Sequence, residues 1–401
     1  MQLRNILSLA DFELAARKHL PRPILGYVAG GAEDNIALQS AAAAYRQWSF
    51  VPRVLVDVSQ RSQQVELLGE TYASPFGIAP MGISALIAYE GDLALARAAE
   101  AANIPMIVSS TALTRLEEVR AAAPRSTWFQ AYLPGDAAKI DAMVQRVRSA
   151  GYRTLVLTVD VATLPSRENN VRVGFTMPLR PSVRLAWDGI TRPRWTIGTL
   201  LRTLLRHGMP HFENSSAARG VPIFSRAAVR EFGSRDTLSW THVDQMRRLW
   251  PGSLVLKGIL STEDARIAAD RGVDGVIVSN HGGRQLDSST APLLALPAIV
   301  KVKGSMKVMI DSGIRRGTDV LKAIALGADF VFLGRPFIYA AAIGGQAGVA
   351  HAIALLSHEI QQDMALLGVN SLRELGPAAL SRSAVPGTTP SMSRAQFPAA
   401  T

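Results

Sequence analysis

Short apolar runs alternate with longer amphipathic stretches along most of the chain. The runs are rich in β-branched residues, as buried strands are, and the stretches between them repeat at helical spacing. The pattern predicts eight strands, at residues 76–80, 104–109, 127–132, 153–160, 253–257, 273–279, 306–311 and 328–334. Helices are expected at residues 91–99, 115–122, 136–150, 241–249, 261–271, 292–303, 317–326 and from 336 onward. Such units close most economically into an eight-stranded β/α (TIM) barrel of the α/β class.

A helical extension is expected before the barrel. Ser8 is a good N-cap residue and Asp11 stands in the capping-box position, so a helix should begin after Ser8 and end at Leu20-Pro21. A second helix is predicted over residues 24–34, with Tyr27 on its apolar face. The pattern alone places Tyr27 in the core.

The connection from the fourth to the fifth strand is unusually long. Such connections hold roughly 2 to 6 residues, yet this one runs from Arg167 to Trp240. Its part from 179 to 212 combines arginines with tryptophans and leucines, and Asp188 is its only acidic residue. Basic and apolar side chains together predict docking on an anionic membrane surface, with a lid or a subunit contact as the alternatives. We therefore expect one domain over residues 1–401, with 179–212 as a membrane-associating insertion.

Composition and charge narrow the classes of function. The chain has 401 residues, of which 48% are hydrophobic, and it contains no cysteine, so disulfides and thiolate metal sites are excluded and no metal is expected. The net charge of +11 indicates an acidic partner: an anionic substrate, nucleic acid or phospholipid headgroups. The first residues lack the apolar core of a signal peptide, and no run appears long and apolar enough to span a membrane. A cytoplasmic protein without a spanning helix is expected.

Chemically capable residues follow every predicted strand. In β/α barrels the active-site groups come from the carboxyl ends of the strands. These ends carry Met81-Gly82, Ser109-Ser110, Gln130 and Tyr132, Thr158 and Asp160, Lys257, His281 and Arg284, Asp311 and Arg315, and Gly334-Arg335. The series predicts an active site at this end of the barrel.

The stretch from Ser279 to Asp287 places an imidazole and a guanidinium on one loop. His281 can take a proton near neutral pH, and Arg284 can hold a carboxylate with two hydrogen bonds. A small acid would then be gripped and deprotonated at one place. The alternative is a polar surface turn with a capping histidine.

Glycines and arginines follow the last two strands, at residues 311–317 and 333–336, where helices begin. This is the usual phosphate position of the fold. Lys257 ends an apolar strand and should point into the barrel mouth, where a buried ammonium needs an anionic partner. A flavin would provide that partner, because its reduced ring carries negative charge near N1 and O2.

Five stretches together resemble the family of FMN-dependent α-hydroxy-acid dehydrogenases and oxidases: 128–132, 157–160, 255–258, 279–287 and 311–317. The resemblance runs from about Tyr27 to about Gly368 and is strongest to the (S)-mandelate and bacterial L-lactate dehydrogenases of the family. It implies oxidation of an L-2-hydroxy acid to the 2-oxo acid, with FMN as cofactor.

The resemblance also implies roles for individual residues. His281 would be the catalytic base, Asp160 would support its imidazolium, and Lys257 would face flavin N1 and O2. The substrate would be bound by Tyr27, Tyr132, Arg167 and Arg284. Hydrogen bonds around the isoalloxazine would come from Ser109, Gln130 and Thr158. The ribityl-phosphate tail would be held by Asp311, Arg315, Gly334 and Arg335, and further cofactor contacts by Pro80, Met81, Gly82, Ser279 and Gly313.

Two departures from the family pattern bear on the reaction. Met81 stands where members commonly have threonine or valine, so a hydroxyl beside the flavin is absent. The loop that carries Arg167 also differs in its amino-acid sequence from the corresponding loop of the family. Gly82 matches the dehydrogenases, which favours a membrane quinone as electron acceptor over the alternative, a soluble oxidase that uses oxygen. Small residues at Gly82 and Ala131 predict room for a bulky substrate side chain.

The implied partners are a 2-hydroxy acid, a quinone, the inner face of the cell membrane, and further copies of the chain in a homo-oligomer, by resemblance a tetramer. No nucleic acid is expected. Two other classes of protein fit less well. An FMN-containing isomerase would not need His281 and the carboxylate-binding arginines, and a non-catalytic anion- or nucleic-acid-binding barrel would use the positive charge alone.

Overall fold

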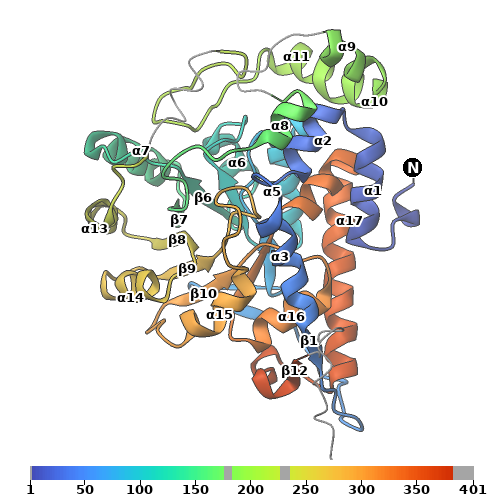
Figure 1. Ribbon diagram of the computed structural model, residues 1–401, viewed down its shortest axis with the longest axis vertical. Helices are drawn as coiled ribbons and strands as arrows, with labels where there is room; N and C mark the ends of the chain where they lie inside the picture. Colours follow the sequence, from blue (N-terminus) through green and yellow to red (C-terminus); the bar gives the residue numbers. More distant parts are fainter. Residues whose placement is uncertain (1, 176–182, 226–234, 383–401) are drawn as a thin grey trace, which may run out of the picture.

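The computed structural model describes residues 2–175, 183–225 and 235–382 (Figure 1). Eight parallel strands form a closed barrel in chain order, and the last pairs with the first. They are β4 (Phe76–Ile78), β5 (Met106–Ser109), β6 (Thr127–Ala131), β7 (Thr154–Thr158), β8 (Ser253–Ile259), β9 (Gly275–Val278), β10 (Lys307–Ile310) and β11 (Phe330–Leu333). The predicted barrel and all eight of its strands are confirmed.

Alternate residues of the barrel strands form two apolar clusters. One cluster fills the interior, with Ile107, Trp128, Val156, Val255, Ile277, Met309, Phe330 and Phe332. Strands β2 (Val65–Leu67) and β3 (Glu70–Tyr72) pair into a hairpin, whose Tyr72 contacts Phe330 and accepts a hydrogen bond from the indole of Trp128. Both partners lie near the starts of their strands, so the hairpin closes the amino end of the barrel and leaves the carboxyl end for the site.

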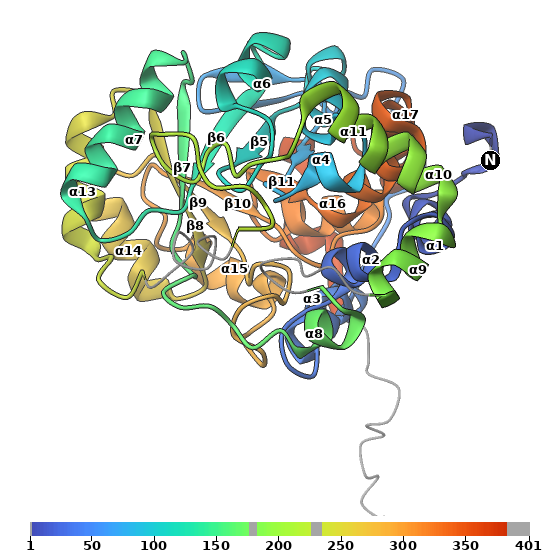
Figure 2. The ribbon, with the colours of Figure 1, turned by 90° about the horizontal axis from the view of Figure 1, so that it is seen from above.

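Helices surround the barrel (Figure 2). They are α5 (Gly91–Ala101), α6 (Leu116–Ala122), α7 (Ala137–Ser149), α13 (Trp240–Leu249), α14 (Thr262–Asp270), α15 (Pro292–Val300), α16 (Gly317–Ala325) and α17 (Arg335–Leu367). Each lies where the sequence predicts a helix. A short additional helix, α4 (Ser84–Ile87), follows β4.

The length and composition of α17 contradict one expectation. This helix is long and apolar enough to cross a membrane, so the chain does contain such a run. However, half of its apolar window is buried in the protein, it packs against α1, α5 and α16, and its backbone is non-helical at Gly345. In this fold α17 is the last helix of the barrel.

The chain before the barrel folds over its carboxyl end. Helix α1 (Leu9–His19) begins after Ser8, and Asp11 closes the predicted capping box. Helix α2 (Arg22–Ala29) ends earlier than predicted, because Gly30 is extended. Asp287, from the loop after β9, accepts three backbone N–H groups at the start of α3 (Ile36–Ala44), at 2.7 to 3.1 Å. This contact fastens the extension to the loop that carries His281.

Shorter elements complete the chain. β1 (Trp48–Phe50) pairs with β12 (Leu380–Arg382). Single 3-10 turns are η1 (Leu3–Asn5), η2 (Tyr45–Gln47), η4 (Leu372–Glu374) and η5 (Pro377–Ala379).

The predicted insertion between β7 and β8 lies outside the barrel and beside α1 and α2 (Figures 1 and 2). It contains α8 (Glu168–Val173), α9 (Val183–Ile190), α10 (Pro193–Trp195), the π-helical stretch η3 (Thr196–Leu201) and α11 (Arg202–His207). Residues 179–182 of the predicted membrane segment lie outside the described residues.

Candidate active site

A cavity of about 340 Å³ opens at the carboxyl ends of the strands. Most of the predicted site residues line it: Tyr27, Pro80, Met81, Gly82, Tyr132, Thr158, Arg167, Lys257, His281, Arg284, Asp311, Gly313, Arg315, Gly334 and Arg335. The other predicted residues lie just behind this layer, where Asp160 contacts His281, Ser279 contacts Lys257, and Ser109 contacts Gln130. The structure thus brings the predicted set together.

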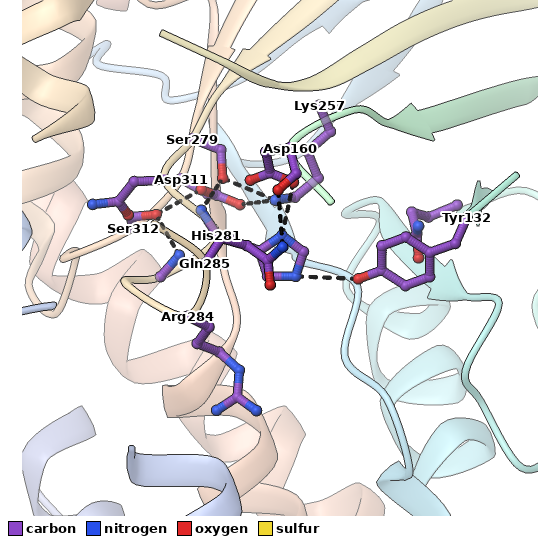
Figure 3. Close-up of polar contacts among 12 residues, drawn as sticks. Tyr132, Asp160, Lys257, Ser279, His281, Arg284, Gln285, Asp311 and Ser312 are labelled. Atoms are coloured by element: carbon purple, nitrogen blue, oxygen red, sulfur yellow. Dashed lines mark hydrogen bonds and ion pairs between the residues drawn. The ribbon is translucent and has the colours of Figure 1, made fainter. Parts of the chain in front are cut away.

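His281 is held at both ring nitrogens (Figure 3). Its Nδ1 lies 2.9 Å from the Asp160 Oδ1 atom, and its Nε2 lies 3.1 Å from the Tyr132 hydroxyl. The backbone of His281 is left-handed, with φ of 57°, and its N–H donates to the Ser279 hydroxyl. These contacts fix the imidazole in one orientation with Nε2 toward the cavity.

The protonation states in this group suit a general base. Burial lowers the pKa of His281 below its ordinary 6.5, and the charge of Lys257 adds to this, although Asp160 opposes it. Burial alone would raise the pKa of Asp160, but the interactions with His281 and Lys257 outweigh it, so Asp160 stays a carboxylate. A carboxylate beside Nδ1 places the proton of neutral His281 on that nitrogen. Nε2 is therefore free to accept a proton.

This arrangement predicts a pH profile. We expect kcat/KM to decline at low pH with a midpoint below pH 6.5, because the pKa of His281 lies below its ordinary value of 6.5. Asp160→Asn should move the decline to still lower pH and lower the plateau by about 10² to 10⁴-fold, because the imidazolium loses its partner. Initial rates between pH 4.5 and 9 measure both effects. A decline centred above pH 6.5 would contradict this assignment.

Two arginines lie on the rim beside Tyr27. Arg284 donates to the backbone carbonyls of Tyr27 and Gly30, and its guanidinium lies 4.7 Å from the centre of the Tyr27 ring. Arg167 donates to the Arg284 carbonyl at 3.0 Å and to the Gln285 side chain at 2.8 Å. Burial lowers the pKa of Arg167 to about 10, and the neighbouring Arg284 adds to this. A substrate carboxylate placed here would relieve the repulsion between the two cations.

Lys257 is buried and lines the cavity, as predicted, but β8 does not end at this residue and continues to Ile259. Its Nζ lies 2.9 Å from the Asp311 carboxylate and 2.9 Å from the Ser279 hydroxyl. The exposed fractions of the Lys257 and Asp311 side chains are 5% and 8%. The ammonium is therefore neutralised by Asp311 in the protein alone, and it still lines the cavity.

The polar groups of the cavity fit a flavin. The Nε2 of Gln130 and the hydroxyl of Thr158 are buried and have no hydrogen-bond partner in the protein. Buried polar groups are normally paired, and the carbonyl and nitrogen edges of an isoalloxazine supply such partners. Gly313, with φ of 84°, belongs to the turn that is predicted to bind the phosphate, and a side chain there would strike the Ala41 carbonyl at 2.3 Å.

Arg335, which is predicted to bind the ribityl-phosphate tail, already makes three hydrogen bonds to backbone carbonyls. Its guanidinium donates to the carbonyls of Val28, Gly30 and Gly282, which leaves only the remaining N–H groups of Nη1 and Nη2 for a phosphate. Burial lowers its pKa to about 9, and repulsion from Arg284 and Arg315 contributes. An anion between these arginines would stabilise all three charges.

Several lining residues escaped the sequence analysis. Phe212 and Arg235 line the cavity, and the Arg235 guanidinium lies 5.2 Å from the centre of the Tyr132 ring. In addition, the ring of Phe175 packs at a tilt against the ring of Tyr27, which lines the cavity, with 4.5 Å between the two ring centres. These three residues come from the irregular insertion and the chain next to it, where no periodicity marks them.

The two small residues that were predicted to leave room for a bulky substrate differ in their position relative to the cavity. Gly82 lines the cavity, and a Cβ atom there would lie 2.3 Å from the Thr111 hydroxyl. Ala131 does not line the cavity, because its side chain is fully buried in β6. Among the described residues, no group of three His, Asp or Glu side chains is placed to hold a metal ion.

Comparison with known proteins gives close matches over nearly the whole chain. Residues 16–382 match the model of the FMN-dependent dehydrogenase family. The chain is 37% identical to (S)-mandelate dehydrogenase of Pseudomonas putida, over 96% of this chain and 97% of that protein. It is 39% identical to L-lactate dehydrogenase of Xanthomonas euvesicatoria pv. vesicatoria, over 94% and 97%. The crystal structure of the monotopic membrane protein (S)-mandelate dehydrogenase matches with a TM-score of 0.89 at 37% identity, over 94% of this chain and all of that one.

Proposed function

The chain belongs to the family of FMN-dependent dehydrogenases, and we propose that it oxidises an L-2-hydroxy acid with a large side chain to the 2-oxo acid. The family, the FMN cofactor and the class of oxidoreductase predicted from the sequence are confirmed by these matches. The observation that carries the proposal is that His281, Arg167 and Arg284 line one cavity. The buried Gln130 Nε2 and Thr158 hydroxyl, which have no hydrogen-bond partner in the protein, lie at the same site.

The residues divide the work as follows. Arg167 and Arg284 bind the substrate carboxylate, which orients the carbon that bears the hydroxyl group. His281 accepts a proton at Nε2, and Asp160 stabilises the resulting imidazolium through Nδ1. Tyr132 can donate its hydroxyl hydrogen to the space beside His281 Nε2 where the substrate hydroxyl group would lie. Burial raises the pKa of its phenol, so this hydroxyl stays protonated. FMN, when bound, accepts the two electrons that leave the substrate.

The cofactor is assigned to the inner part of the cavity. We propose that Lys257, Gln130, Thr158 and Ser109 surround its ring, with Ser279 supporting Lys257, and that the backbone of Pro80, Met81 and Gly82 lies against one face. The ribityl-phosphate tail is assigned to the turn and helix start after β10 and β11, with Asp311 toward the ribityl hydroxyls and Gly313, Arg315, Gly334 and Arg335 toward the phosphate. Removal of FMN should therefore leave the buried charge of Arg335 uncompensated.

A substrate panel tests the proposed function. (S)-Mandelate, L-lactate and glycolate are compared with a soluble electron acceptor, and the 2-oxo acid is identified. We expect kcat/KM for (S)-mandelate to exceed that for glycolate, because the apolar cavity wall at Ile83, Ile87 and Phe212 favours a large side chain. Equal or better use of glycolate would refute the assignment of side-chain size.

The acceptor is proposed to be a membrane quinone. The comparisons include a monotopic membrane protein, which supports peripheral membrane association, and the proposed face is the inner one. The experiment is to compare turnover with a quinone analogue and with oxygen as the only acceptor. Faster turnover with oxygen would identify the chain as a soluble 2-hydroxy-acid oxidase. The predicted tetramer is likewise a proposal, which the mass of the protein in solution tests.

The membrane-facing side of the insertion is apolar. Val183, Trp187 and Ile190 are exposed on α9, and Ile197, Leu201 and Leu205 are exposed along η3 and α11. Arg194 and Arg206 are exposed beside them. Trp195, which the sequence analysis counted among the membrane-entering residues, is instead 5% exposed. The proposed docking surface is therefore one side of the insertion, within 183–209.

Serine substitution at Ile197, Leu201 and Leu205 together should abolish membrane binding. Each buried aliphatic side chain contributes about 1.5 kcal/mol or more, so partition into anionic liposomes should fall at least about a hundredfold even with partial burial. Flotation of the variant and of the unmodified protein measures this. Leu366→Ser, at an exposed position on α17, is the matched control and should float normally. Equal flotation of all three proteins would exclude this surface as the anchor.

A further inference from the structure

Helix α4 forms part of the cavity wall and is held from outside by the insertion. Ile83 and Ile87, at its two ends, both line the cavity. The Trp195 indole N–H of the insertion donates to the Leu86 carbonyl of α4 at 3.1 Å. The last carbonyls of a helix have no partner within it, so this bond satisfies a group that would otherwise need water.

A second attachment lies just beyond α4. The Arg202 guanidinium of α11 lies 3.8 Å from the centre of the Tyr89 ring, and the Tyr89 hydroxyl lies 3.2 Å from His207 Nε2. His207 also lies 3.5 Å from the Glu90 carboxylate. The side chains of His207 and Glu90 are partly exposed, so this attachment is weaker than the buried indole contact.

The insertion also enters the cavity directly. Phe212 follows α11, is 1% exposed, and lines the same cavity as Ile83 and Ile87. Its backbone N–H donates to the Val221 carbonyl, which fixes it in place. These apolar residues come from segments after β4 and β7, whereas the phosphate-binding residues follow β10 and β11.

We propose that the insertion is a specificity element of the substrate pocket: Trp195 positions α4, and Phe212 and Ile87 form the apolar wall that receives the substrate side chain. This inference rests on the proposed function and identifies what sets the substrate size. The same segment thus has two separable faces. Trp187 and its exposed neighbours face outward, whereas Trp195 is buried against α4 and Phe212 lines the cavity.

Two conservative variants test this proposal in the full-length protein with FMN bound. Trp195→Phe keeps an aromatic ring and removes only the N–H donor, and Phe212→Leu keeps an apolar side chain of smaller area. In each, the ratio of kcat/KM for (S)-mandelate to that for L-lactate should fall about tenfold, the range that a few apolar contacts supply. The loss should appear in KM for (S)-mandelate, whereas the rate of FMN reduction at saturating substrate and the FMN content should hold.

Trp187→Phe is the control, because this tryptophan belongs to the same insertion and is 65% exposed. It should leave the substrate ratio unchanged. An unchanged ratio in both Trp195→Phe and Phe212→Leu, or a fall in kcat with both substrates alike, would overturn the proposal. Failure of the unmodified protein to oxidise any 2-hydroxy acid would instead refute the proposed function, so the two failures are distinguishable.

Discussion

His281→Ala is expected to slow FMN reduction by substrate at least about a thousandfold while FMN stays bound. The variant removes both the proton acceptor and the ring that orients the substrate hydroxyl group, a loss of at least about 4 kcal/mol in the transition state. FMN should remain, because its proposed contacts come from other residues. The oxidised, FMN-loaded enzyme is mixed rapidly with substrate in the absence of any other electron acceptor, which gives the rate of FMN reduction. The flavin spectrum gives the FMN content.

A surface histidine provides the matched control. His358 is exposed on α17, so His358→Ala should reduce its FMN at the normal rate. Loss of FMN together with activity in His281→Ala would mark His281 as a structural residue. Normal reduction of FMN in His281→Ala would exclude it as the base.

Lys257→Met is also expected to have a large effect on the reduction of FMN. It removes the positive charge proposed to face the part of the flavin ring that becomes negative on reduction. A loss of about 3 kcal/mol of this stabilisation would lower the two-electron potential of bound FMN by roughly 65 mV, and we expect reduction by substrate to slow about a hundredfold. Spectroscopic redox titration and rapid mixing measure the two quantities.

The ion pair with Asp311 requires a second variant. Lys257→Met leaves a buried carboxylate unpaired, and breaking a buried pair costs about 3 to 5 kcal/mol of stability. The double variant Lys257→Met/Asp311→Asn removes both charges and should recover much of that stability. Its FMN potential should stay low if Lys257 acts on the flavin directly. A normal potential in the double variant would show that the effect of the single variant comes from the unpaired Asp311.

The barrel was predictable because its strands are buried on both faces. Parallel strands of this kind read as continuous apolar runs, and the fold places the residue after each run at the site. The sequence therefore predicts that His281, Asp160 and Lys257 lie on one site. The capping box at Ser8 and Asp11 could also be predicted, because both of its residues lie within one turn of the chain, and the structure confirms its position.

Long-range contacts explain what the sequence did not predict. Helix α2 ends at Ala29 because the chain turns at Gly30, whose carbonyl accepts from Arg284 and Arg335. Trp195 lies in a stretch whose composition is typical of a membrane-docking segment. It is nevertheless buried, because it packs against α4, which lies far away in sequence. The apolar run of α17 resembles a spanning helix because α1, α5 and α16 pack against it and bury half of its apolar window. No local pattern contains these partners.

The most direct test of the account is anaerobic mixing of the FMN-loaded protein with (S)-mandelate and no other acceptor. Full bleaching of the flavin absorbance is predicted, with one equivalent of 2-oxo acid formed per FMN. The (R) enantiomer should bleach it far more slowly, because with its carboxylate on Arg167 and Arg284 its hydrogen points away from the flavin. Persistent flavin colour with (S)-mandelate and with every other L-2-hydroxy acid tried would contradict the central claim.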